Sequence, residues 1–122
     1  METGGVSRDL IKEDKPLAEK YFLRGIPWMH AASYLGDPYA SLCLGVYYKY
    51  GFGGLQNDEK LATEYFEQAA NSGIAGGQFC FGLSCYNGLG ITRDMEKAKD
   101  NMNKAADQGN QCAISCLKDY SW

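Results

Sequence analysis

Residues 40–53 read ASLCLGVYYKYGFG, and the same pattern returns at residues 77–90 as GQFCFGLSCYNGLG. The two copies are offset by 37 residues at Gly45 and Gly82, and by 36 residues at Gly73 and Gly109, so one residue was gained near Gly54. A partial third copy covers residues 110–122. Repeats of this length indicate a solenoid of helix pairs, in which each unit buries its apolar face only against its neighbours.

More matched positions follow each copy, namely an aspartate, an alanine four residues later, an alanine pair and a closing glycine. They are Asp58, Ala62, Ala69-Ala70 and Gly73, then Asp94, Ala98, Ala105-Ala106 and Gly109. Over about residues 38–120 the pattern resembles the Sel1-like repeat, a relative of the tetratricopeptide repeat. The resemblance implies an all-α fold, a right-handed α-α superhelix of about two and a half helix-turn-helix repeats.

The chain has 122 residues and 45% hydrophobic content, which suits one domain with its own core. We expect a flexible N-terminal arm over residues 1–13 and a single Sel1-like repeat domain over residues 14–122. Within the domain we expect N-terminal capping helices, a first repeat, a second repeat and a partial repeat that forms a C-terminal cap. These parts cover residues 14–35, 36–72, 73–108 and 109–122.

The segment before the first repeat allows two registers. Residues 14–22 match residues 58–66 at Asp, Leu, Ala, Tyr and Phe, which makes them a second helix left over from an earlier unit, followed by about two further turns from Trp28. Alternatively, Ala31-Ala32 aligns with Ala69-Ala70, and residues 14–24 become a first helix. We favour the first register because residues 14–24 lack the Leu-Gly mark. Both registers cap the N-terminal end of the solenoid.

Apolar residues at helical spacing predict helices over residues 38–50, 58–72, 75–87, 94–108 and 111–120. We expect them to bury Ala40, Leu44, Tyr48, Leu61, Ala62, Tyr65, Phe66, Ala69, Ala70, Ala98, Met102, Ala105 and Ala106. Gly51 and Gly88 are interpreted as helix terminators with positive φ. A phosphate loop is disfavoured, because no Lys-Ser/Thr pair follows them.

Charge and hydropathy argue against two classes of partner, namely nucleic acids and membranes. The net charge is −3, with acidic and basic residues interspersed, so we expect no nucleic-acid binding. No apolar run reaches the roughly 18 residues of a membrane span, so we expect no membrane insertion. We expect a cytoplasmic protein, or a periplasmic or exported one if a signal peptide was removed.

Five cysteines leave at least one without a partner in the chain. Cys43, Cys80 and Cys116 are equivalent, and equivalent residues on neighbouring helices lie about 8–10 Å apart, beyond the about 7 Å that a disulfide spans. We interpret the thiols as small buried hydrophobes. A zinc site is disfavoured, because Cys80, Cys85, Cys112 and Cys116 form no Cys-x-x-Cys pair.

Catalytic residues are not evident. His30 is the only histidine and has no orienting partner at a recognisable spacing, so we interpret it as packed or exposed and expect no enzyme, no cofactor and no metal. Cysteine-rich Sel1-like proteins are associated with β-lactam binding. Their cysteine pattern is not matched here, because Ala70 and Ala106 hold the place of one partner. A small-molecule enzyme of that type is the least favoured hypothesis.

The resemblance further implies that the first helices of the units line a concave groove. We expect its partner-binding residues to be Tyr39, Leu42, Cys43, Val46, Lys49, Tyr50, Phe79, Cys80, Leu83, Tyr86, Asn87 and Trp122. Aromatic residues with a few charges are typical of binding hot spots. We therefore favour an adaptor or assembly factor that binds a protein or peptide. The alternative is an immunity-type protein that neutralises a toxin by occlusion. A homodimer through the end helices stays open.

A leucine at position 45 should destabilise the fold. Gly45 follows Leu44 where we expect another helix to cross closely, so Gly45→Leu should lower the free energy of unfolding by about 1–3 kcal/mol through overpacking. Thermal unfolding followed by circular dichroism measures this. A variant that melts within a degree or two of the parent would contradict the predicted crossing.

Overall fold

The computed structural model describes residues 26–120 and 122, and the regular structure in this part of the chain is entirely helical. Residues 26–34 are helical. The later helices are α3 (Pro38–Tyr50), the 3-10 helix η1 (Phe52–Gly54), α4 (Glu59–Asn71), α5 (Ala75–Asn87), α6 (Met95–Asp107) and α7 (Gln111–Asp119). The predicted all-α repeat fold is confirmed, and the predicted helices differ from these only at their capping residues.

Part of the predicted N-terminal organisation lies outside the described residues. This applies to the arm over residues 1–13 and to the capping helix that starts at Asp14. The turns predicted from Trp28 onward are confirmed by the helix over residues 26–34. That helix ends in a turn at Gly36, which has a φ of 97° and whose amide donates a hydrogen bond to the carbonyl of Ser33.

Side chains at most helix starts accept hydrogen bonds from free backbone amides. The residues that do so are Asp37 for α3, Asp58 for α4, Asp94 for α6 and Asn110 for α7. Such caps stabilise a helix by about 1 kcal/mol. Helix α5 starts after Ile74 without a side-chain cap, so its formation depends on packing. Gly51 and Gly88 end α3 and α5 with a φ of 70°, which confirms their role as terminators.

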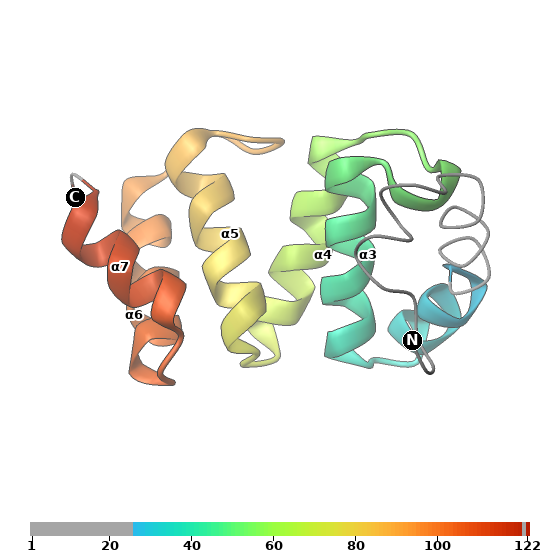
Figure 1. Cartoon of the computed structure of the whole chain (residues 1–122), viewed down its shortest axis with the longest axis horizontal. Helices are drawn as coiled ribbons and strands as arrows, with labels where there is room; N and C mark the ends of the chain where they lie inside the picture. Colours follow the sequence, from blue (N-terminus) through green and yellow to red (C-terminus); the bar gives the residue numbers. More distant parts are fainter. Residues whose placement is uncertain (1–25, 121) are drawn as a thin grey trace, which may run out of the picture.

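The helices pack in chain order, with α3 against α4, α4 against α5, α5 against α6 and α6 against α7. Figure 1 shows them side by side in a row, with the helix over residues 26–34 at one end and α7 at the other. Two helix pairs, α3 with α4 and α5 with α6, therefore form the repeated units, and α7 opens the third.

The core is divided between the junctions of successive helices. One buried cluster joins α4, α5 and α6, and a second joins α6 and α7. The first contains Ala62, Phe66, Ala70, Phe81, Cys85 and Ala98, and the second contains Met102, Ala105, Ala113 and Cys116. The buried contacts thus join successive units, as the repeat pattern requires.

Four residues that we expected to be buried are only half-buried, namely Tyr48, Leu61, Tyr65 and Ala106. The two tyrosines cover the core from the outside, where their rings stack on each other with centroids 5.8 Å apart and planes 9° apart. A stacked pair at the edge of the core keeps its hydroxyl groups near solvent, which explains the partial burial.

Glycines sit where one helix crosses another at close range. A Cβ added at Gly45 would lie 2.5 Å from Cε1 of Phe66 and 3.2 Å from the carbonyl oxygen of Ala62, which confirms the predicted crossing. At Gly77 the added Cβ would lie 2.5 Å from the Cβ of Ala69 and 2.8 Å from its carbonyl carbon. The backbones of α4 and α5 therefore approach each other too closely for any side chain at position 77.

Two adjacent glycines of α5 provide a matched test of this crossing. Gly77→Ala should lower the free energy of unfolding by about 1–3 kcal/mol, because backbone atoms of α4 cannot move aside. Gly76→Ala should change it by no more than about 1 kcal/mol, because its Cβ meets only the flexible end of Leu42 at 3.0 Å and alanine favours the helix. Urea unfolding of both variants measures the difference. Equal stabilities would exclude a close crossing at Gly77.

Candidate partner-binding site

A small apolar pocket of about 120 Å³ opens between α3 and α5. Six of its lining residues belong to the predicted partner-binding set, and they are Val46, Lys49 and Tyr50 from α3, and Phe79, Cys80 and Leu83 from α5. The seventh is Phe66 of α4, which is only 2% exposed and therefore forms the floor. Two successive units thus build one pocket, which we call the α3–α5 pocket.

Four of the other predicted residues lie on the same two helices but outside the pocket. Tyr39, Cys43 and Asn87 are exposed, and Leu42 is half-buried against the core cluster of α4, α5 and α6. Leu42 is partly covered because its side chain reaches the backbone of α5 near Gly76.

The remaining two predicted residues contact each other further along the chain. The rings of Tyr86 and Trp122 have centroids 4.9 Å apart in an edge-to-face arrangement. The indole N–H of Trp122 donates a hydrogen bond of 2.9 Å to the carbonyl of Cys116 in α7. The structure therefore places six of the twelve predicted residues at the α3–α5 pocket, two at the junction of α5 with α7, and four at neither.

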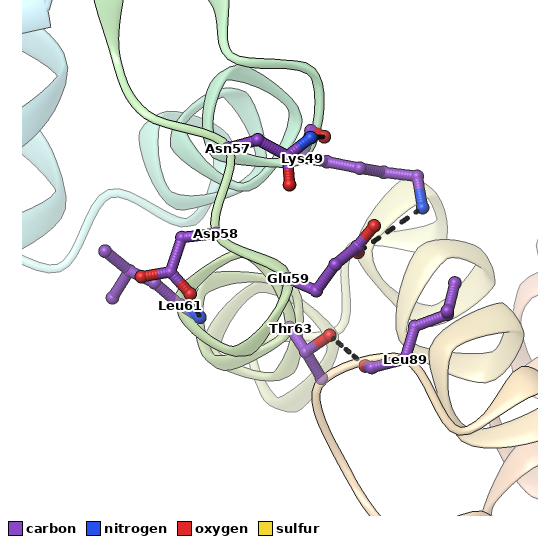
Figure 2. A network of polar contacts seen from close by, with 7 residues as sticks. All are labelled: Lys49, Asn57, Asp58, Glu59, Leu61, Thr63 and Leu89. Atoms are coloured by element: carbon purple, nitrogen blue, oxygen red, sulfur yellow. Dashed lines mark hydrogen bonds and ion pairs between the residues drawn. The ribbon is translucent and has the colours of Figure 1, made fainter.

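Lys49 supplies the charge at the rim of the pocket. Its Nζ lies 3.8 Å from Oε1 of Glu59 (Figure 2). The same Nζ lies 5.8 Å from the centre of the Tyr50 ring. Both charged side chains are partly exposed, so this ion pair contributes little to stability. The ammonium group therefore stays available to a polar or aromatic group of a partner.

A polar network fixes the two units relative to each other beside the pocket (Figure 2). The hydroxyl of Thr63, which is buried in α4, donates a hydrogen bond of 2.8 Å to the carbonyl of Leu89 after α5. Gly90 next to it would clash with the backbone of Glu59 if it carried a Cβ. The loop after α5 thus packs directly on the start of α4, which sets the spacing between the units.

Phe52 extends the aromatic rim and was not among the predicted residues. Its ring stacks on Tyr50, with centroids 5.6 Å apart and planes 25° apart, and it is 37% exposed. The available signal was an aromatic residue directly after the terminator glycine Gly51. Phe66 was expected in the core, where it lies, but its contribution to the pocket floor was also missed.

The thiol of Cys80 faces the pocket in its protonated form. Burial raises the pKa of this thiol to about 11, although nearby Lys49 acts in the opposite direction. A protonated thiol is a poor nucleophile, so Cys80 contributes apolar surface at neutral pH. The interpretation of the cysteines as buried hydrophobes is confirmed for Cys85 and Cys116. It is wrong for Cys43 and Cys112, whose helix positions face solvent.

His30 is packed between aromatic rings. Its Nε2 lies 3.4 Å from the hydroxyl of Tyr48, and its ring meets those of Tyr48 and Tyr65 edge-on. His30 also borders a broad cavity of about 680 Å³ with Tyr34 and Gln68. These contacts agree with the interpretation of His30 as a packing residue.

A second broad cavity, of about 450 Å³, has a more polar lining that includes Glu67, Lys97 and Asp100. In the part of the chain that the structure describes, no three His, Cys, Asp or Glu side chains are grouped to hold a metal ion. Within the same residues, every helix falls short of the length and hydrophobicity that a membrane crossing requires. Of the three cavities, the α3–α5 pocket is the one whose lining is mainly apolar.

Comparison with known families finds the Sel1 repeat at residues 38–74 and again at residues 78–110. Sel1 repeats generally mediate protein–protein interactions. The chain is 31% identical over 118 residues to the chitin synthase regulator SKT5 of Saccharomyces cerevisiae. It is 34% identical over 92 residues to an uncharacterised protein of Neisseria meningitidis. These matches cover 96% and 75% of this chain, but only 16% and 20% of the relatives.

Solved structures show the same architecture. A Sel1 repeat protein from Oxalobacter formigenes superposes with a TM-score of 0.77 at 30% identity, over 81% of this chain and 29% of that one. A protective antigen present in uropathogenic Escherichia coli strains, which displays an SLR fold, gives a TM-score of 0.74 at 29% identity, over 90% of this chain and 26% of that one. The chain thus spans about a quarter of the length of each.

The pKa of Cys80 leads to a test of the pocket in solution. At pH 8, iodoacetamide should alkylate Cys80 at least about tenfold more slowly than the exposed Cys43 and Cys112, because little thiolate is present. The Cys80 rate should rise about tenfold per pH unit up to pH 10, since the pKa of about 11 is not yet reached. Peptide mass spectrometry measures each site. Equal rates at Cys80 and Cys43 at pH 8 would show that Cys80 is not shielded.

Proposed function

Because the chain belongs to the Sel1 repeat family, we propose that it is a non-catalytic interaction module, an adaptor or assembly factor, that binds a protein or peptide at the α3–α5 pocket. The observation that carries this proposal is the convergence of six predicted residues from two units on one apolar pocket. Interface hot spots have this composition, with apolar walls inside and a charge at the rim.

The surroundings of the pocket support the proposal. Tyr50 is 60% exposed and Tyr39, about three helical turns away on α3, is 64% exposed. Large aromatic side chains held open to solvent on a rigid helix bind a partner at little cost in conformational entropy. Since the helix pairs pack through close backbone contacts, the pocket is formed before a partner arrives.

The chemistry of the lining favours binding over catalysis. The thiol of Cys80 is protonated at neutral pH, and the lining contains no histidine, carboxylate or serine side chain. What the lining offers is apolar area, one ammonium group and one phenol hydroxyl. These groups recognise an apolar side chain with a polar edge.

Site-specific photo-cross-linking tests the proposal. Benzoylphenylalanine in place of Tyr50 should form an adduct with a protein in a lysate of the native host, and excess untagged chain should suppress it. The same photoreactive residue in place of Asn103, which is exposed on α6, is the matched control and should give no such adduct. Mass spectrometry identifies the adducts.

The adducts distinguish the candidate roles. Several unrelated partners at position 50 support an adaptor, a single stoichiometric toxin supports neutralisation, and a second copy of this chain supports a homodimer. Equal labelling at positions 50 and 103, or competition by excess Val46→Phe as strong as that by the parent chain, would reject the pocket as the binding site.

A further inference from the structure

The repeat allows the α3–α5 pocket to be compared with its equivalent one unit later. Three of its residues, Val46, Lys49 and Tyr50, correspond to Leu83, Tyr86 and Asn87 at an offset of 37 residues. On the other wall, Cys80 corresponds to Cys116 at an offset of 36 residues. The equivalent of the pocket therefore lies between α5 and α7, with Tyr86 and Cys116 on its two walls.

An aromatic side chain of the chain itself occupies this second position. Trp122 touches both walls, because its ring meets Tyr86 at 4.9 Å and its N–H donates to the carbonyl of Cys116 at 2.9 Å. It is half-buried, and it packs against both core clusters, which meet at α6. Thus the junction of two Sel1 units seats an indole ring that bridges the neighbouring helices.

We propose that the α3–α5 pocket binds a tryptophan or tyrosine side chain of the protein partner, seated as Trp122 is seated between α5 and α7. This inference rests on the proposed function, since it names the chemistry that the partner brings to the same pocket. Trp122 is the template, because it fills the equivalent junction with an apolar ring and directs a polar edge at the helix backbone.

The dimensions and walls of the pocket suit one aromatic ring. A cavity of about 150 Å³ accommodates a whole benzene molecule, and the α3–α5 pocket has about 120 Å³, so it takes the apolar part of one ring. Phe66 forms an apolar floor, and Tyr50 stands at the rim for stacking. A partner ring that packs on Tyr50 in an offset-stacked or edge-to-face arrangement adds binding free energy beyond that of the apolar area it buries.

The rim residue that differs between the two junctions also suits an aromatic ligand. Where Tyr86 contacts Trp122 through its ring, the first unit has Lys49. The ammonium group of Lys49 already lies over an aromatic ring, that of Tyr50, at 5.8 Å. A lysine at the edge of an aromatic site attracts the face of an incoming ring. In the α3–α5 pocket, a cation–π contact between Lys49 and the ring of the partner would thus take the place of the ring contact between Tyr86 and Trp122.

Peptide selection against the whole chain tests the inference. A phage-displayed library of random peptides is selected on the parent chain, and selected peptides are synthesised and measured by fluorescence polarisation. We expect each peptide family to carry a tryptophan or tyrosine whose replacement by alanine weakens binding about tenfold or more. Val46→Phe, which fills the pocket, should weaken binding to a similar degree, whereas Asn103→Ala, on the exposed face of α6, should leave affinity within about twofold.

Each result decides between the two proposals. Peptides that require the pocket but present leucine or isoleucine there would overturn the aromatic preference and leave the proposed function intact. Peptides that bind equally well to Val46→Phe, or a selection that yields no binder, would overturn both. If Val46→Phe does not reproduce the circular dichroism spectrum of the parent, Tyr50→Ala at the exposed rim replaces it, with the same expected loss.

Discussion

The close approach of successive helix backbones is the constraint on which the structure depends. At Gly45 a ring and a carbonyl of α4 leave no room for a Cβ, and at Gly77 the backbone of α4 itself fills that space. Alanines such as Ala62 and Ala69 face these glycines and keep the approach short. Because packing at this distance tolerates neither a longer side chain nor a shift in register, the rotation of each helix about its axis is fixed. Surface residues then take their positions from the same contacts.

The position of the α3–α5 pocket follows from these crossings, because its residues contact or directly follow the crossing glycines. Gly45 lies against Phe66, so the Phe66 ring is held beneath α3, where it becomes the pocket floor. Val46 comes directly after Gly45, and Leu83 comes directly after Gly82, so both walls are set by residues that neighbour a crossing glycine. The hydrogen bond from Thr63 across to the next unit then holds the walls at a constant spacing. A pocket built in this way is rigid, and rigidity reduces the entropic cost of binding.

Features set by the repeated residues could be predicted from the sequence. Features that depend on contacts with residues outside the repeat pattern could not. Helix bounds, glycine terminators and the crossing at Gly45 are local or repeated, so the pattern predicted them correctly. Only half of the predicted site residues line the pocket. The helical period predicts which face of a helix a residue lies on, but it does not predict how much of that face the next helix covers. Leu42 is partly covered by α5 for that reason. Phe52 lies in a turn, where no period applies.

Differences between the two units explain why their junctions have different surfaces. Gly77 and Gly82 of α5 are matched by Ala113 and Lys118 of α7, and Lys49 and Tyr50 of the first unit are matched by Tyr86 and Asn87 of the second. The opposite wall differs too, because Phe79 and Leu83 are matched by Ser115 and Asp119, so each junction has its own contacts. One junction receives an indole from its own chain, whereas the other keeps an open apolar pocket with a cationic rim. The shared residues therefore identify the family and the fold, and the diverging residues give each junction a different surface chemistry.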